Sequence, residues 1–228
     1  MCGRFIQITD PEKIRVLFAE FDVETKARAR YRPRYNISPT APILTVVNHP
    51  TPTLTLTRWG LVPFWAKDPA IGNMMINARA ETLSSKPSFR EPFRKRRCLI
   101  LADGFYEWTS SGTTRIPFFV CMKNREPFAM AGLWDLWRNT MTGENLASST
   151  IITTEPNALI AQVHNRMPVI LPREMHALWL SSDPVPEADL AACLRPYPAR
   201  DMEAYSVSRM VNTPTNDSPA CISPVRGV

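Results

Sequence analysis

Short stretches of alternating or continuous apolar residues recur along most of the chain and predict strands. Residues 53–57 alternate threonine and leucine with a period of two, as a half-buried strand does. They follow an apolar run at residues 43–47, and the two prolines within residues 49–52 favour a hairpin between the two strands. Residues 4–8 form a short apolar segment, and the same patterns predict further strands at residues 98–102, 117–122, 127–134, 149–153, 169–171 and near 205–208.

Helical spacing of apolar residues is confined to three segments. Residues 14–21 present apolar side chains at i, i+3, i+4 and i+7 behind a capping sequence at residues 9–12, which predicts a helix of about three turns. A second helix is expected from a cap at Thr154, with Pro156 in its first turn, to about His164. A third is expected over residues 173–180.

Strands outnumber helices in this pattern, and few pairs of strands are bridged by a helix. The predicted fold class is therefore α+β: a mainly antiparallel β barrel or sandwich with a few flanking helices. The chain shows no internal repeat and no clear domain boundary, so we expect residues 1–228 to form a single domain.

The formal charge of +6 is concentrated in two basic clusters, at residues 26–34 and 90–97. Such clusters are typical of solvated faces, and also of surfaces that bind a phosphate backbone. No apolar run approaches the roughly 18–20 residues of a membrane span, and the first residues do not resemble a signal peptide, so we expect a soluble, cytoplasmic protein. Five widely spaced cysteines without a C-x-x-C motif predict neither a disulfide framework nor a metal site, and no cofactor is expected.

Cys2 directly follows Met1, and removal of Met1 would leave an α-amine and a thiol on adjacent carbons. Such an amine attacks an aldehyde to give a Schiff base, and the thiol then closes a five-membered thiazolidine. Gly3 permits close approach of a ligand, and Arg4 places a permanent cation beside the nucleophile, which suits an anionic substrate. On these residues alone, an ordinary small residue near a terminus is an equally good interpretation of Cys2.

Polar residues interrupt two otherwise apolar segments. In residues 76–82, a period of two places Asn77, Arg79 and Glu81 on one face of a strand, where an amide can orient a nucleophile and a guanidinium can hold a phosphate. Glu107 stands among three aromatic residues, which would raise its pKa toward the range useful for proton transfer. A solvent-facing strand edge and a structural carboxylate are the respective alternatives.

Two further candidates lie in or beside predicted loops. His164 ends the second predicted helix and is followed by Arg166, so a proton carrier stands near a phosphate-binding cation. A histidine that only satisfies the helix end is the alternative. Trp65 ends an aromatic loop and could stack on nucleic-acid bases, although such aromatics also serve as core plugs.

Seven short motifs follow one another along the chain, at residues 1–5 (MCGRF), 34–39 (RYNISP), 59–63 (WGLVP), 76–82 (INARAET), 102–108 (ADGFYEW), 164–168 (HNRMP) and 208–212 (SRMVN). In this order they resemble the signatures of the SRAP family, named for SOS-response-associated peptidase. The resemblance runs from Cys2 to about Asn212, nearly the whole chain, and the combination is far more specific than any single motif.

The resemblance implies covalent capture of abasic sites in single-stranded DNA through a thiazolidine at Cys2. The implied catalytic roles are the nucleophile Cys2, Asn77 holding its amino terminus, Glu107 as general acid and base, and His164 assisting ring opening and cross-link reversal. The implied DNA contacts are the phosphate-binding Arg4, Arg79 and Arg166, the weaker contacts Asn36, Ser38, Thr153 and Arg209, and a wedge of Pro39 and Trp65. Ala66 departs from the pattern, because some members carry a second tryptophan there.

The same resemblance implies a monomer that acts near junctions of single- and double-stranded DNA during the DNA damage response, nucleoid-associated when bound. It also implies lyase-like Schiff-base chemistry, with removal of Met1 by the chain itself or by an aminopeptidase. Two other function classes stay open. One is an N-terminal-cysteine amidohydrolase or glutamine amidotransferase, whose further motifs are not found. The other is a non-covalent binder of single-stranded nucleic acid that uses the basic clusters and Trp65.

Overall fold

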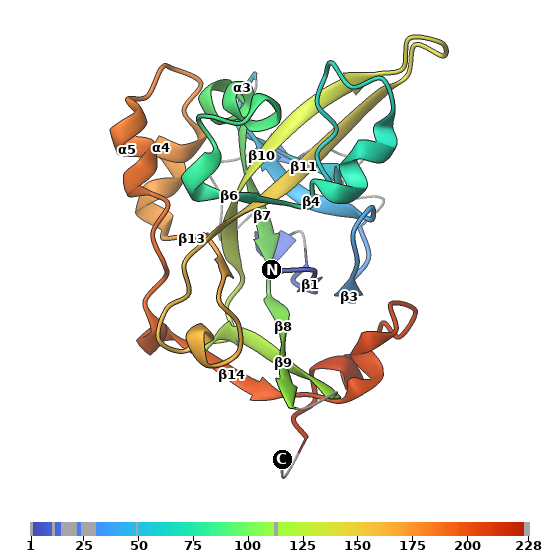
Figure 1. The fold of residues 1–228 in the computed structure, drawn as a ribbon, viewed down its shortest axis with the longest axis vertical. Helices are drawn as coiled ribbons and strands as arrows, with labels where there is room; N and C mark the ends of the chain where they lie inside the picture. Colours follow the sequence, from blue (N-terminus) through green and yellow to red (C-terminus); the bar gives the residue numbers. More distant parts are fainter. Residues whose placement is uncertain are drawn as a thin grey trace.

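The computed structural model describes residues 2–10, 12–14, 22–23, 31–48, 50–111 and 114–225. Its smaller sheet has five strands in the spatial order β14-β9-β8-β1-β3, and every pairing within it is antiparallel. β8, β9 and β14 lie in the lower half of Figure 1. The strands of this sheet are β1 (Arg4–Gln7), β3 (Arg34–Ile37), β8 (Gly104–Ser111), β9 (Thr114–Met122) and β14 (Met202–Ser206).

The larger sheet closes on itself. The strands β11, β10, β7, β4 and β5 pair in that order, and β5 pairs again with β11 in parallel, through Ser148 with Arg58 and Ser149 with Trp59. These strands are β4 (Pro42–Val47), β5 (Thr53–Trp59), β7 (Arg97–Ala102), β10 (Phe128–Arg138) and β11 (Asn145–Thr154). The short strands β2 (Asp22–Val23), β6 (Asn77–Arg79), β12 (Met167–Pro168) and β13 (Ile170–Leu171) pair with members of this ring.

Buried hydroxyl groups form hydrogen bonds between the strands where this barrel closes. The hydroxyl of Thr57 lies 2.8 Å from that of Thr45 and 2.7 Å from that of Ser149, all three being buried. Because buried hydroxyls need partners, this chain of hydrogen bonds ties β4, β5 and β11 together inside the barrel.

Gln7 connects the two sheets. Its buried side chain donates to the carbonyls of Leu44 on β4 and Leu101 on β7, at 3.0 and 2.7 Å, and accepts from the amide of Leu44 at 3.0 Å. β1 therefore belongs to the smaller sheet by its backbone and to the barrel by this side chain. An apolar cluster that includes Cys2, Phe5 and Trp59 fills the space beside it.

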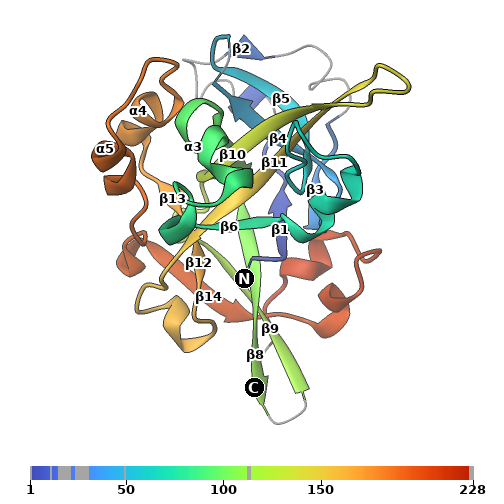
Figure 2. The same ribbon diagram turned by 45° about the horizontal axis from the view of Figure 1, so that its top comes forward.

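The α-helices that lie wholly within the described residues are α3 (Pro87–Lys95), α4 (His176–Leu180) and α5 (Glu187–Ala192). The helices α3, α4 and α5 gather at one side of the barrel, at the upper left of Figure 2. The 3-10 helices are η1 (Pro69–Met74), η2 (Ala80–Thr82), η3 (Ile160–Gln162), η4 (Arg173–Met175), η5 (Ala199–Asp201), η6 (Arg209–Asn212) and η7 (Pro219–Ile222). Within the described part of the chain, no helix combines the length and the apolar character that crossing a membrane requires.

Arg97 attaches two of these helices to the barrel. It is fully buried at the start of β7 and donates to four backbone carbonyls at 2.5 to 3.1 Å. The acceptors lie at the C-terminal ends of α3 and α4, where carbonyls lack partners within the helix and the helix dipole favours a cation. They belong to Phe93, Arg94, Trp179 and Ser181.

The predicted fold class is confirmed, and so is the hairpin of β4 and β5. The predicted strands at 98–102, 117–122, 127–134, 149–153, 169–171 and 205–208 correspond to β7, β9, β10, β11, β13 and β14, with shifted ends, and β1 lies in the apolar segment at 4–8. The elements that were not predicted include α3, α5, β8 and β12. β3 was not predicted either, and the third predicted helix corresponds to η4 and α4.

The prediction of a helix from Thr154 to His164 is wrong, because only the 3-10 turn η3 forms there. The Asn157 side chain accepts from the amides of Leu159 and Ile160 and donates to the Tyr197 carbonyl. A side chain that bonds nearby amides competes with the helical ladder and favours a turn. Most of the helix predicted over residues 14–21 lies outside the described residues.

We expect Arg97→Met to lower the free energy of unfolding by about 3 kcal/mol, because buried carbonyls would lose a charged donor. Urea unfolding at neutral pH measures this change. Arg94→Met is the matched control, since that side chain is exposed, and its effect should stay within about 0.5 kcal/mol. Equal effects of the two variants would contradict the role of Arg97.

Candidate active site

Cys2 stands two residues before the start of β1 and is fully buried. Because β1 pairs with β3 on one edge and β8 on the other, the start of the chain is held inside the molecule, near the centre of Figure 1. The thiol Sγ lies 3.8 Å from the Arg4 carbonyl oxygen. Burial raises the pKa of this thiol, and the neighbouring Glu107 carboxylate raises it further.

Asn77 reaches Cys2 from the barrel. It lies on β6, which pairs in parallel with β11, and its Nδ2 donates to the Cys2 carbonyl at 2.9 Å. The other side-chain atom, Oδ1, is buried and has no hydrogen-bond partner among the described residues. A buried amide oxygen of this kind suits an N–H donor. Asn77 thus combines a bond that fixes the Cys2 backbone with an acceptor beside it.

Glu107 and His164 lie together at this end of the site. Glu107 on β8 is 1 % exposed, and burial raises the pKa of its carboxyl to about 7. The Nε2 of His164 lies 4.0 Å from the Glu107 Oε2. Burial lowers the pKa of His164, and its Nδ1 accepts from the Arg166 amide at 3.0 Å. In that tautomer the ring proton resides on Nε2, which faces the carboxylate.

Arg4 is only partly available to a ligand. Its Nη1 donates to the Asn36 side chain at 2.8 Å and to the Val211 carbonyl at 2.9 Å, which anchors it to η6. Asn36 is fully buried, and its Nδ2 donates to the carbonyls of Val211, Thr213 and Asn216. In this structure the Asn36 side chain therefore holds the C-terminal segment in place and does not present a contact surface.

Arg79 on β6 and Arg166 differ in whether their side chains have protein partners. Arg79 is exposed at the end of β6, and its side chain makes no hydrogen bond or ion pair with any described residue. Arg166 donates to both carboxylate oxygens of Glu81, at 2.7 and 3.0 Å. Thr153 lies opposite Arg79 in the β6–β11 register and is fully buried, so its hydroxyl packs inside the sheet.

The remaining predicted contacts lie on loops and in one 3-10 helix. Ser38 and Pro39 are half-buried after β3, and Arg209 is exposed in η6. Trp65 is 49 % exposed and, with Phe64, lines a hollow of about 430 Å³ together with Arg96 and three residues of α3. The guanidinium of Arg96 lies 5.8 Å from the centre of the Phe64 ring. The loop thus presents flat apolar surface beside positive charge.

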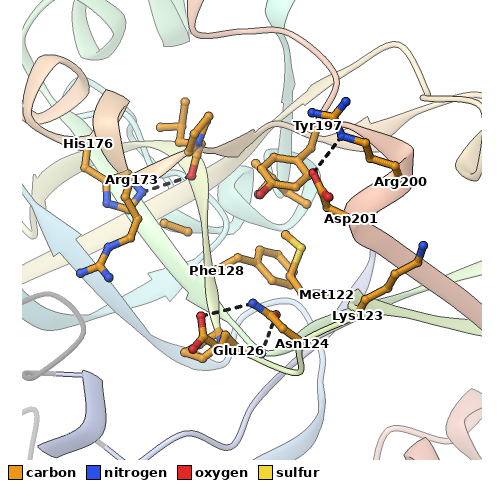
Figure 3. Close-up of a pocket in the computed structure, with 15 residues that line it drawn as sticks. Met122, Lys123, Asn124, Glu126, Phe128, Arg173, His176, Tyr197, Arg200 and Asp201 are labelled. Carbon is orange, nitrogen blue, oxygen red and sulfur yellow. Dashed lines mark hydrogen bonds and ion pairs between the residues drawn. The ribbon is translucent and has the colours of Figure 1, made fainter.

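A separate cavity of about 350 Å³ contains none of the predicted site residues (Figure 3). Phe128 and Tyr197 contribute aromatic walls, and Lys123 and Arg173 stand among the polar lining residues. Among the described residues, no group of histidine, cysteine and acidic side chains could hold a metal ion.

A model of the SRAP family, described as SOS response associated peptidase, matches residues 1–214. The chain belongs to this family. Abasic site processing protein YoqW of Bacillus subtilis (strain 168) is 46 % identical over 225 residues, which cover 97 % of this chain and 99 % of that protein. Abasic site processing protein HMCES of Gallus gallus is 31 % identical over 264 residues, covering 99 % of this chain and 78 % of that protein.

The fold of this SRAP chain also occurs in solved structures. A crystal structure of a protein from Bacteroides thetaiotaomicron superposes with a TM-score of 0.89 at 28 % identity, covering 98 % of this chain and 100 % of that chain. A Bordetella bronchiseptica protein superposes with a TM-score of 0.76 at 26 % identity, covering 91 % of this chain and 100 % of that chain. The barrel and the smaller sheet are therefore shared with experimentally determined proteins.

Glu81 in this SRAP chain has a partner that was not predicted from the sequence. Glu81 was placed on the face of Asn77 and Arg79, whereas β6 ends at Arg79 and Glu81 belongs to η2. Its hydrogen bond to Arg166 lowers the pKa of its carboxyl. The opposite charges of Glu81 and Arg166 are compatible with an ion pair. Their two motifs are far apart in the sequence, however, and only the folded chain brings them together.

The raised pKa of Glu107 has a measurable effect on stability. Its folded-state pKa of about 7 exceeds the ordinary value of 4.5, so the folded protein loses stability as the pH rises between these values. Glu107→Gln keeps the size and removes the charge. We expect this variant to exceed the wild type in free energy of unfolding by about 1–3 kcal/mol near pH 8, with a much smaller difference near pH 5.

Urea unfolding across this pH range measures the difference. The control is Glu155→Gln, which removes an exposed carboxylate and should leave the pH dependence unchanged. A difference between Glu107→Gln and the wild type that does not change with pH would contradict the burial of an ionisable Glu107.

Proposed function

We propose that this protein captures abasic sites in single-stranded DNA as a covalent thiazolidine on Cys2 after Met1 is removed. One observation carries the proposal: the second residue of the chain is held by Asn77 beside a buried carboxyl whose pKa is about 7. The relatives named as abasic site processing proteins support the same substrate. An abasic site supplies the aldehyde that an aminothiol requires.

The order of the steps follows from the ionisation of the groups. Burial raises the pKa of the Cys2 thiol, so the thiol stays protonated while the α-amine attacks C1′ of the opened sugar. Glu107, about half protonated near pH 7, donates a proton to the departing hydroxyl, and water leaves to give a Schiff base. The thiol then adds to the carbon of the protonated Schiff base and gives its proton back to Glu107, while the nitrogen becomes the neutral ring amine. Aldehyde and aminothiol become thiazolidine and one water.

His164 has a supporting role in this scheme. Its neutral ring directs Nε2 toward Glu107, from which position it would assist opening of the closed sugar and reversal of the cross-link. Asn77 would orient the Cys2 amine through its buried Oδ1. Both side chains belong to the candidate active site and both are at least partly shielded from water, which strengthens their electrostatic effect.

The surroundings suit a single strand that bends at the lesion. Arg79 is an uncommitted cation at the end of β6, whereas Arg4 and Arg166 already have protein partners. We propose that these three hold phosphates and that Trp65 and Pro39 form a wedge at a junction with duplex DNA, with Ser38 and Arg209 as weaker contacts. We further propose that the chain acts as one domain and as a monomer. Met1 would be removed by the chain itself or by an aminopeptidase.

Intact-protein mass spectrometry tests the proposal. After incubation with a single-stranded oligonucleotide that carries one abasic site, we expect the mass of the processed chain plus the oligonucleotide minus one water. Cys2→Ala should give no adduct, because neither ring closure nor a stable product is possible. Cys193→Ala is the matched control and should react like the wild type, since that cysteine lies at the end of α5.

A processed wild-type chain that forms no adduct would contradict the proposal. Release of ammonia from glutamine would then favour the amidotransferase. Retention of DNA only under native conditions would favour the non-covalent binder.

A further inference from the structure

The guanidinium of Arg166 is held almost entirely by protein groups. Its Nη1 and Nη2 donate to the two oxygens of Glu81 as a parallel pair of hydrogen bonds. Nη2 also donates to the Thr153 carbonyl at 2.6 Å. The third nitrogen, Nε, is buried and has no hydrogen-bond partner among the described residues.

This arrangement leaves Arg166 one edge through which an anion can approach. The Nε side is closed to solvent, and the inner proton of Nη2 is directed at β11. The outward edge, formed by Nη1 and Nη2, is the edge that Glu81 covers. The Arg166 side chain is only 15 % exposed, whereas that of Glu81 is 55 % exposed. The carboxylate can therefore leave for water more easily than the guanidinium can.

A carboxylate and a phosphate present the same pair of oxygens to an arginine, and both bind it through two parallel hydrogen bonds. We propose that Glu81 occupies the phosphate position of Arg166 and competes with DNA for it. This inference rests on the proposed function, in which Arg166 holds a phosphate of the strand. Glu81 would then be a specificity-determining residue of the SRAP site.

Competition by Glu81 has different consequences for DNA with an abasic site and for undamaged DNA. Every strand that uses Arg166 must displace Glu81, so all reversible binding is weakened to the same extent. A strand with an abasic site is afterwards retained by covalent bonds, whereas an undamaged strand relies on reversible contacts alone. Glu81 would thus shorten the time spent on undamaged DNA and leave the captured product intact.

The test measures the affinity of Glu81→Gln for an undamaged single-stranded oligonucleotide by fluorescence anisotropy at fixed salt. We expect a Kd about three- to tenfold lower than that of the wild type, because a neutral amide competes poorly with phosphate. In an Arg166→Ala background the same substitution should have no such effect. Glu203→Gln is the matched control, because Glu203 on β14 is also paired with an arginine, Arg125, and its loss changes the net charge equally.

The inference would be overturned by an unchanged Kd for Glu81→Gln, by a gain in affinity no larger than that of Glu203→Gln, or by a gain in affinity that persists without Arg166. Weaker binding by Glu81→Gln would show that Glu81 positions Arg166 for DNA, which also contradicts competition. Glu81→Ala should change the Kd in the same direction as Glu81→Gln. Undamaged DNA carries no aldehyde, so the Kd measurement does not depend on adduct formation. The Kd can contradict the role of Glu81 while the adduct still forms, and the adduct can be absent while the Kd changes as expected.

Discussion

Strand β1 is hydrogen-bonded along both edges, and this fixes where the chain begins. Its pairing with β3 and β8, together with the bonds from Gln7 into the barrel, places Cys2 in the interior. An N-terminal residue is ordinarily exposed and mobile. Here the start of the chain becomes part of a packed site, with Asn77 and Glu107 approaching from different sheets.

Burial gives the candidate active site its chemistry and also weakens the fold. The same loss of water that raises the pKa of Glu107 into the neutral range destabilises its charged form in the folded protein. Arg97, by contrast, is a buried cation that satisfies helix-end carbonyls, so its charge supports the attachment of α3 and α4. One buried ionisable group, Glu107, thus contributes to reactivity, and another, Arg97, stabilises the packing of the helices.

Sequence patterns predicted the elements whose structure depends mainly on neighbouring residues. The alternation of residues 53–57 predicted β5, because its side chains face opposite sides of one layer. α3 was not predicted, since Pro92 and its many charges obscure the helical spacing of Phe89 and Phe93. Cys2, Asn77, Glu107 and His164 were all named from the sequence, and they lie in one site. The burial of Asn36 and the pairing of Glu81 with Arg166 depend on contacts between distant segments, which no local pattern records.

The central claim is that the α-amine and the thiol of Cys2 both form bonds to C1′ of the abasic sugar. Carbon-13 NMR with an abasic oligonucleotide labelled at C1′ and protein labelled with nitrogen-15 in cysteine tests it most directly. The account predicts that C1′ becomes a tetrahedral carbon coupled to the nitrogen of Cys2. A trigonal imine carbon that persists, or a tetrahedral carbon without coupling to cysteine nitrogen, would contradict the thiazolidine and with it the role of the N-terminal aminothiol.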